Sequence, residues 1–410
     1  MPLAATSALP TVTIRRWQVY TYNFALVIGL IAFRADFGQR RVYRWPLMQI
    51  YACTLNALIV ITLPLSYPTA LTYLDYLNEN RLMKMVNFVN TTQIFTITAL
   101  AIIFRWKREH TIFEILTRML ELEREYFDKC VPTVVKRYCA HFYSNRLLWI
   151  KYFSIITQGV YTAYNLTLLI PDINLISLLY SSHMLCLISV LLHMILHYFL
   201  AMWYVWQRFC WLNVQLRRIF NILQLSVHKR YSSSLRRRLR GRLARELMDV
   251  ARVHRQLTGF AERLTDCYRL QLFAVLLSKI INNISIGYLC FKYGSNPYFK
   301  NLDAFNRSFS FVAFVMTLSD SFYLDIICDR VAVAAREAAE VLKRFHELLR
   351  VDDRVDYACD LLSQHLRFCK LSISVFGVIG VNKRLSFLVF GGFVKNVLLL
   401  LQWDLAKQFD

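Results

Sequence analysis

The chain is poor in the patterns on which enzymes, disulfide-bonded modules and metal centres depend. Its ten cysteines include no Cys-x-x-Cys pair. Most lie in apolar segments or basic loops, so we expect them to pack rather than form disulfides or bind metal. No Gly-x-Ser-x-Gly, His-x4-Asp or Asp-His-His-Cys pattern occurs, and the nine histidines are scattered. The sequence therefore predicts neither an enzyme nor a bound metal or cofactor.

Acidic residues are also scarce. The chain has 27 aspartates and glutamates against 49 lysines and arginines, which gives a formal net charge of +22. No RNA- or DNA-binding pattern accompanies this charge. A membrane protein accounts for it differently, because lysine and arginine collect in cytoplasmic loops and are attracted to the anionic lipid of the inner leaflet. We therefore expect membrane lipid, and no nucleic acid, as a partner.

Apolar residues, by contrast, are abundant, at 56% of the chain. They gather in seven segments of about 20 residues, long enough for a helix to cross the hydrocarbon core. Only helices satisfy their own backbone groups there without leaving an open edge. We predict an all-α, multi-pass membrane protein with spans at 47–66, 85–104, 149–170, 177–200, 270–291, 305–327 and 385–403.

The segments between these spans alternate between basic and nearly neutral. Lysine and arginine number 40 on one side of the predicted membrane and 5 on the other. The basic side is cytoplasmic, so the N-terminus is predicted inside the cell and the C-terminus outside. The apolar stretch 17–33 is interrupted by Asn23 and Gly29, and we expect an inner-surface or re-entrant helix there. An eighth crossing would place the 40 basic residues outside the cell.

Four regions follow from this topology: a cytoplasmic segment at 1–46, six spans with their cytoplasmic extensions at 47–327, cytoplasmic anchor helices at 328–384, and a last span with a short tail at 385–410. The cytoplasmic loops have few prolines and glycines. Within 234–250, leucines recur every four residues, which predicts an amphipathic helix. The arginines at 236–242 have no apolar span around them, so we expect a solvated, lipid-facing surface rather than a voltage sensor.

Polar and aromatic side chains gather in the outer halves of four spans. Such groups are costly in hydrocarbon unless they face protein or water, and aromatic walls with a few polar groups suit a small organic molecule. The alternative is that they form hydrogen bonds between helices. The candidate ligand-binding residues are Asn90, Gln93, Tyr161, Tyr164, Asn165, Tyr180, His183, Asn283 and Tyr288.

Charged residues inside the spans give two further hypotheses. Lys279 and Asp320 lie at similar depth when counted from their cytoplasmic ends, so we expect a structural ion pair. In the last span, Lys395 and Gln402 are seven residues apart and share a face with Leu398 and Leu399. A polar residue at the outer end followed by bulky aliphatic residues is what a pore-lining helix needs. Several subunits around one axis would supply one such helix each.

The last span resembles that of the insect gustatory receptor family. The family pattern is Thr-Tyr, five hydrophobic residues and Gln-Phe, and this chain has Lys-Asn, five hydrophobic residues and Gln-Trp at 395–403. The segment Gly-Val-Ile-Gly-Val-Asn at 377–382 is similar to the one that precedes the family's last span. His254 and Leu257, followed by Leu264, Tyr268 and Gln271-Leu272, are similar to the family's pattern before the fifth span.

This resemblance implies a tetrameric, ligand-gated, non-selective cation channel in the plasma membrane, expected in a sensory neuron dendrite. The seventh spans would line one central pore, with Leu399 at the gate and Gln402 in the outer pore. A bitter or other small organic tastant would bind in the outer half of each subunit. The change from Thr-Tyr to Lys-Asn bears on the inner pore, because four Lys395 side chains on the axis would repel cations. A homo-tetramer would keep all four lysines on the axis. A hetero-tetramer with other gustatory receptor subunits would have fewer of them.

Two other functions remain open from the sequence. A solute transporter would place its substrate where helices break at glycine or proline in repeated halves, but the chain has no evident repeat and only Pro64 within a predicted span. Solute flux without ionic current would favour this function. A seven-helix receptor coupled to a G protein would need the opposite orientation.

The charge distribution predicts where each terminus lies. An epitope tag at the C-terminus should bind antibody on intact cells, whereas a tag at the N-terminus should bind only after permeabilisation. Antibody binding to an N-terminal tag on intact cells would contradict both the orientation and the channel.

Overall fold

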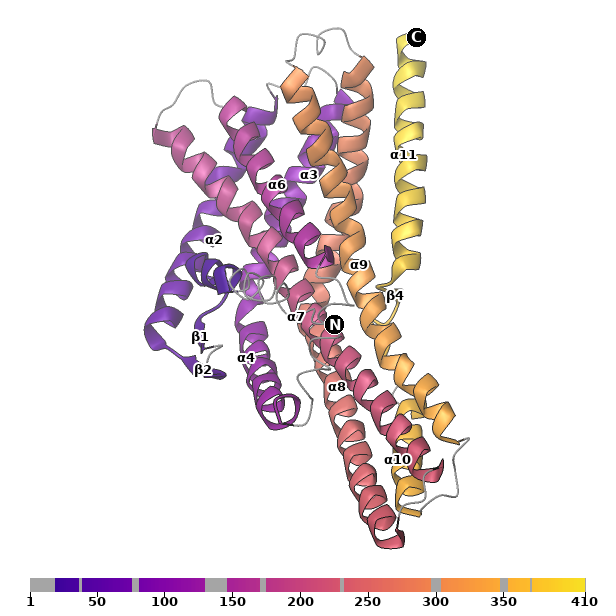
Figure 1. The fold of residues 1–410 in the computed structure, drawn as a ribbon. Coiled ribbons are helices and arrows are strands. Elements are labelled where there is room, and N and C mark those ends of the chain that lie inside the picture. The colour runs from indigo at the N-terminus through magenta and orange to yellow at the C-terminus, as the bar shows by residue number, and fades with distance from the viewer. Residues whose placement is uncertain are drawn as a thin grey trace.

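The computed structural model describes residues 19–36, 39–75, 81–129, 146–169, 175–228, 232–295, 304–346, 353–368 and 371–409. Long helices dominate this part of the chain (Figure 1). Each of the seven predicted spans coincides, to within one residue at its ends, with part of one long helix. These are α2 (Pro46–Asp75), α3 (Arg81–Ile103), α6 (Arg146–Leu169), α7 (Leu175–His228), α8 (Ser233–Ser295), α9 (Ala304–His346) and α11 (Lys383–Phe409).

Length and composition alone identify four membrane-spanning candidates among the described residues. They are Pro46–Pro68, Leu178–Val227, Phe311–Phe345 and Lys383–Trp403, in α2, α7, α9 and α11. Helix α3 has a shorter apolar stretch, Thr91–Ile103. The chain is therefore an all-α, multi-pass membrane protein.

The segment expected to lie at the inner surface is a short helix followed by a hairpin. Residues 19–27 are helical and span about 14 Å, less than half of the hydrocarbon core. The helix ends at Val27, and Gly29 in the turn that follows has a φ of +70°, which favours glycine. Antiparallel strands β1 (Phe33–Asp36) and β2 (Arg41–Arg44) follow. Within the described residues, 19–33 do not contain a helix long enough to cross the membrane.

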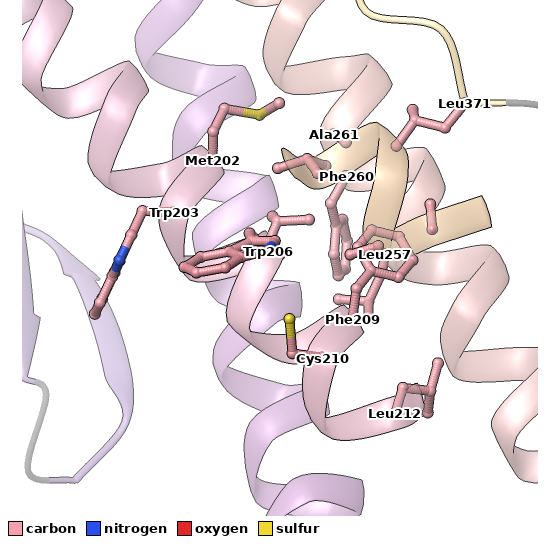
Figure 2. Packing of buried hydrophobic residues seen from close by; sticks show 14 of the residues in the cluster. Met202, Trp203, Trp206, Phe209, Cys210, Leu212, Leu257, Phe260, Ala261 and Leu371 are labelled. Carbon is pink, nitrogen blue, oxygen red and sulfur yellow. The ribbon is translucent and has the colours of Figure 1, made fainter. Parts of the chain in front are cut away.

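Helices α7, α8 and α9 continue without a break beyond their predicted spans, as expected. Their extensions pack with α10 (Asp353–Phe368) into a long bundle below the membrane-spanning part (Figure 1). Leu243 and Leu247 of the predicted leucine stripe are buried, whereas Leu235 at its start is exposed. Figure 2 shows how Phe209 of α7 packs towards Leu257 and Phe260 of α8.

A buried ion pair joins α7 to the helices that follow α3. These are α4 (Arg105–Leu122) and a single π-helical turn, η1 (Glu123–Phe127). The Nε of Arg208 donates to Glu123 Oε2 at 2.7 Å, its Nη2 donates to Oε1 at 3.0 Å, and the Tyr204 hydroxyl donates to Oε2 at 2.6 Å. The guanidinium also lies 4.1 Å from the ring centroid of Trp211. This bidentate contact is the geometry in which an arginine–carboxylate pair is strongest.

Two histidines connect the helices of the cytoplasmic bundle. His254 Nε2 lies 3.1 Å from the Ala335 carbonyl oxygen, and its Nδ1 lies 3.1 Å from His365 Nε2. Because a carbonyl only accepts, His254 carries its proton on Nε2, and its Nδ1 accepts from His365. Burial lowers the pKa of His254 to about 4, and burial together with Arg255 lowers that of His365. The neutral imidazoles thus hold α8, α9 and α10 together.

Acidification should weaken this contact. Below pH 6.5 the unfolded chain binds a proton at residue 254 that the folded chain does not bind until about pH 4, so stability falls as pH falls through that window. We expect a loss of about 1.4 kcal/mol at pH 5.5 from this group. The thermal midpoint of purified protein should therefore drop more between pH 7.5 and 5.5 than that of His254→Gln, which keeps a donor and an acceptor but does not titrate. Equal drops would contradict the assignment.

Candidate functional site

Helix α11 lies at the edge of the bundle, against α8 and α9 (Figure 1). One face packs inward through Phe393 and Val397, which are 9% and 2% exposed. The opposite face carries Lys395, Leu398, Leu399 and Gln402, all exposed. The four predicted pore residues therefore form one stripe that points away from the rest of the chain.

The inward face fits closely against α8 at Gly287. A Cβ at Gly287 would lie 2.5 Å from Cε2 of Phe393 and 3.1 Å from Cγ2 of Val397. The absence of a side chain thus allows the two helices to approach. At the cytoplasmic end, the buried Ser386 hydroxyl donates to Asp325 Oδ2 at 2.6 Å, and Lys383 pairs with Asp329 of α9 at 3.3 Å. Helix α11 is held at its base and at its middle.

Asn283, one of the predicted ligand-binding residues, lies beside this contact. It lines a small cavity between α8, α9 and α11, together with Phe322, Asp325 and Phe393. The cavity holds about 20 Å³, which is room for about one water molecule. The cavity is too small for an organic ligand.

The other predicted ligand-binding residues fall into separate groups. Tyr161 and Tyr164 of α6 both meet the ring of Phe309 in α9, at 5.7 and 5.6 Å between centroids. Tyr180 of α7 packs against a cluster formed mainly by α2, α3 and α7, and Tyr288 of α8 is fully buried. The side chains of Asn90 and Asn165 lie outside the part that the structure describes.

His183 and Gln93 are half-buried polar residues on neighbouring helices of that region. His183 Nε2 lies 3.0 Å from Thr62 Oγ1 of α2. A second hydrogen bond, of 2.7 Å, joins the hydroxyls of Tyr67 in α2 and Thr92 in α3. These are hydrogen bonds between helices, the alternative that the sequence left open. However, His183 Nδ1 and both amide atoms of Gln93 are buried with no hydrogen-bond partner among the described residues. The ligand pocket stays a prediction.

The intramembrane carboxylate Asp320 has a lysine partner that the sequence reasoning did not consider. Its Oδ1 forms an ion pair with Lys151 of α6 and lies 3.4 Å from the Ser154 hydroxyl. Both charged side chains are almost completely buried. The expected partner was Lys279, whose side chain lies outside the described residues, so that pairing stays a prediction. Lys151 is recognisable in the sequence as a lysine within a predicted span.

Comparison with known proteins agrees with this architecture. The family described as 7tm chemosensory receptor matches residues 20–407. The chain therefore belongs to the 7tm chemosensory receptor family, whose members are receptors and not enzymes.

Individual relatives lie among insect chemoreceptors. The chain is 23% identical over 370 residues to putative gustatory receptor 22b of Drosophila melanogaster, with 88% of each chain covered. It is 23% identical over 174 residues, 42% of each chain, to putative gustatory receptor 58b of the same species. The olfactory receptor OR5 of Machilis hrabei superposes with a TM-score of 0.68 at 15% identity, covering 95% of this chain and 99% of that one. The same receptor in complex with eugenol gives a TM-score of 0.69 at 14% identity.

The Lys151–Asp320 pair predicts an asymmetry between single and double substitutions. Lys151→Met or Asp320→Leu alone leaves one buried charge without its partner and should cost about 3–5 kcal/mol, whereas the double variant should lose much less. Surface expression and the thermal midpoint in detergent measure the effect. Lys279→Met is made in parallel, and it should cost much less than Lys151→Met if Lys151 rather than Lys279 is the partner of Asp320. A double variant no better than the worse single variant would contradict the pairing.

Proposed function

We propose that this receptor is a tastant-gated, non-selective cation channel in which α11 from each of four subunits lines a shared pore. The observation that carries this proposal is the composition of the exposed stripe of α11. Lipid-facing helices avoid charged and amide side chains at membrane depth, yet Lys395 and Gln402 are exposed there between apolar neighbours. A water-filled pore at a subunit interface would hydrate the Lys395 ammonium and the Gln402 amide, whereas lipid chains would not.

The order of residues along the stripe supports a pore with an outer polar ring and an apolar gate. Gln402 is nearest the outer end, and Leu399 lies about 4.5 Å deeper along the helix. Leu399 is 50% exposed in the single chain, so its side chain is available to meet copies of itself around an axis. An apolar ring of this kind closes a pore by dewetting. Lys395 lies a further turn inward, where its charge favours assembly with subunits that lack it.

Ligand binding is proposed for the outer halves of the helices that surround Gln93 and His183. Their unpartnered polar atoms call for a partner that the described residues do not provide. The relative in complex with eugenol shows that the same fold accommodates a small organic molecule in that receptor. A bitter or other small organic tastant is proposed here because two relatives carry the name gustatory receptor. The corresponding location is the plasma membrane of a sensory neuron dendrite.

The contacts of α11 provide a route from ligand to pore. The α8 and α9 helices both carry residues in the outer region and both touch α11, through Gly287 and through Asp325. A ligand that shifts either helix relative to the other therefore changes the support on which α11 rests. Differential affinity for the two arrangements is what gating requires.

The pore assignment predicts distinct effects along one helix. Leu399→Ala should raise the current recorded without tastant, because it weakens the apolar ring, and Gln402→Ala should change ion selectivity or conductance. Leu400→Ala is the matched control, since Leu400 is an equal side chain on the same helix but off the stripe. The measurement is current from cells that express the chain with candidate partner subunits and a tastant panel. If both stripe variants conduct like the parent, the pore lies elsewhere.

A further inference from the structure

A strongly basic surface lies at the far end of the cytoplasmic bundle, where the beginnings of α8 and α10 meet (Figure 1). A groove of about 860 Å³ opens between them. Five arginines line it: Arg237, Arg238, Arg242 and Arg245 from α8, and Arg354 from α10. One carboxylate, Asp353, lines it with them.

Membrane lipid does not neutralise this surface. Arg238 and the predicted membrane boundary near residue 270 belong to one unbroken helix, and the 32 residues between them extend for about 48 Å. The Debye length at physiological ionic strength is about 8 Å. If the membrane boundary lies near residue 270, the unbroken helix carries the arginines at 236–242 far from the headgroups, which favours a solvated surface over a lipid-facing one.

The described residues that line the groove do not balance its charge either, because they include five arginines and one carboxylate. Arg242 pairs with Glu246 at 2.9 Å, and Arg245 Nε donates to the Gly241 carbonyl at 3.4 Å. Among the described residues that line the groove or pair with its arginines in a salt bridge, Asp353 and Glu246 stand against five arginines, which leaves an excess of positive charge. Arg354 also lies in the first turn of α10, where the helix dipole disfavours cations and favours anions. An anionic ligand would relieve both effects.

The shape of the groove suits clustered phosphates. The position of a Cβ at Gly241 is 3.6 Å from Nη1 of Arg354, an ordinary van der Waals separation, so that guanidinium lies against α8 and lines the same groove as the α8 arginines. Guanidinium forks bind phosphate oxygens in pairs, which lysine does not do. The volume falls in the range of small-molecule sites. Tyr357, 65% exposed, adds an aromatic surface at the rim.

We propose that this groove binds a soluble, multiply phosphorylated small molecule of the cytosol, of the class of inositol polyphosphates and nucleoside triphosphates. The ligand would join the start of α8 to the start of α10 and so stiffen the end of the bundle. The site lies far from α11 and does not depend on the proposed channel function.

Binding is measured on the full-length protein in detergent at 150 mM salt, by calorimetry and by the thermal midpoint. Inositol hexakisphosphate and ATP are the two polyphosphate probes, and inorganic phosphate is the simple anion. We expect at least one polyphosphate to raise the midpoint and to bind at least 100-fold more tightly than phosphate. Arg242→Gln and Arg354→Gln should each weaken that binding at least fivefold, and the double variant should abolish it.

Arg252→Gln is the matched control, because Arg252 is an exposed arginine of the same helix outside the groove. It should leave the affinity unchanged, and Arg354→Lys should recover only part of it. Absence of polyphosphate binding to the parent protein would overturn the proposal. So would an equal loss in Arg252→Gln, which would indicate general charge attraction, or displacement by polyglutamate at equal charge concentration, which would indicate an acidic protein partner instead.

Discussion

The structure depends on three helices that cross the membrane boundary without breaking. Helices α7, α8 and α9 contain 54, 63 and 43 residues, and their facing sides share one hydrophobic core that extends into the cytoplasmic bundle. Because packed interiors are dense and deform little, a helix that moves at its outer end must carry its cytoplasmic end with it or shift the packing between neighbours. The core thereby couples the region expected to meet ligand with the region expected to hold subunits together.

Helix α11, in contrast to these three helices, contributes little to the common core. Three of its contacts with α8 and α9 are the packing of Phe393 on Gly287, the hydrogen bond from Ser386 to Asp325 and the ion pair of Lys383 with Asp329. A helix attached at few points changes its tilt at lower cost than one embedded in a dense core. The same arrangement leaves its outer stripe uncovered. The chain thus combines a densely packed support with one helix that is exposed along its outer face, which is the division that the proposed gated pore needs.

Hydrophobic length and charge predicted the seven long helices and their order, because both are properties of the sequence alone. The leucine spacing around Leu243 and Leu247 likewise predicted the cytoplasmic helix. Depth along a helix, however, does not give its rotation, and so the sequence did not single out Lys151 of α6 as the partner that the structure gives Asp320. The π-helical turn that presents Glu123 to Arg208 has no recognisable sequence pattern. The same holds for the left-handed backbone of Phe376 in the hairpin of β3 (Ser374–Val375) and β4 (Ile379–Gly380).

The exposed lysine of α11 connects the proposed pore to subunit composition. Lys395 lies about 6 Å inward of Leu399 along the helix, so in a tetramer of identical chains a cation that passes the apolar ring would next meet four positive charges. Four ammonium groups around a narrow axis repel one another and a permeant cation, and the repulsion grows as the site loses water. Mixed assembly reduces that charge in proportion to the number of partner subunits that have a neutral residue there. On this argument the chain is suited to act as one component of a mixed channel, in which its share of the pore sets the current.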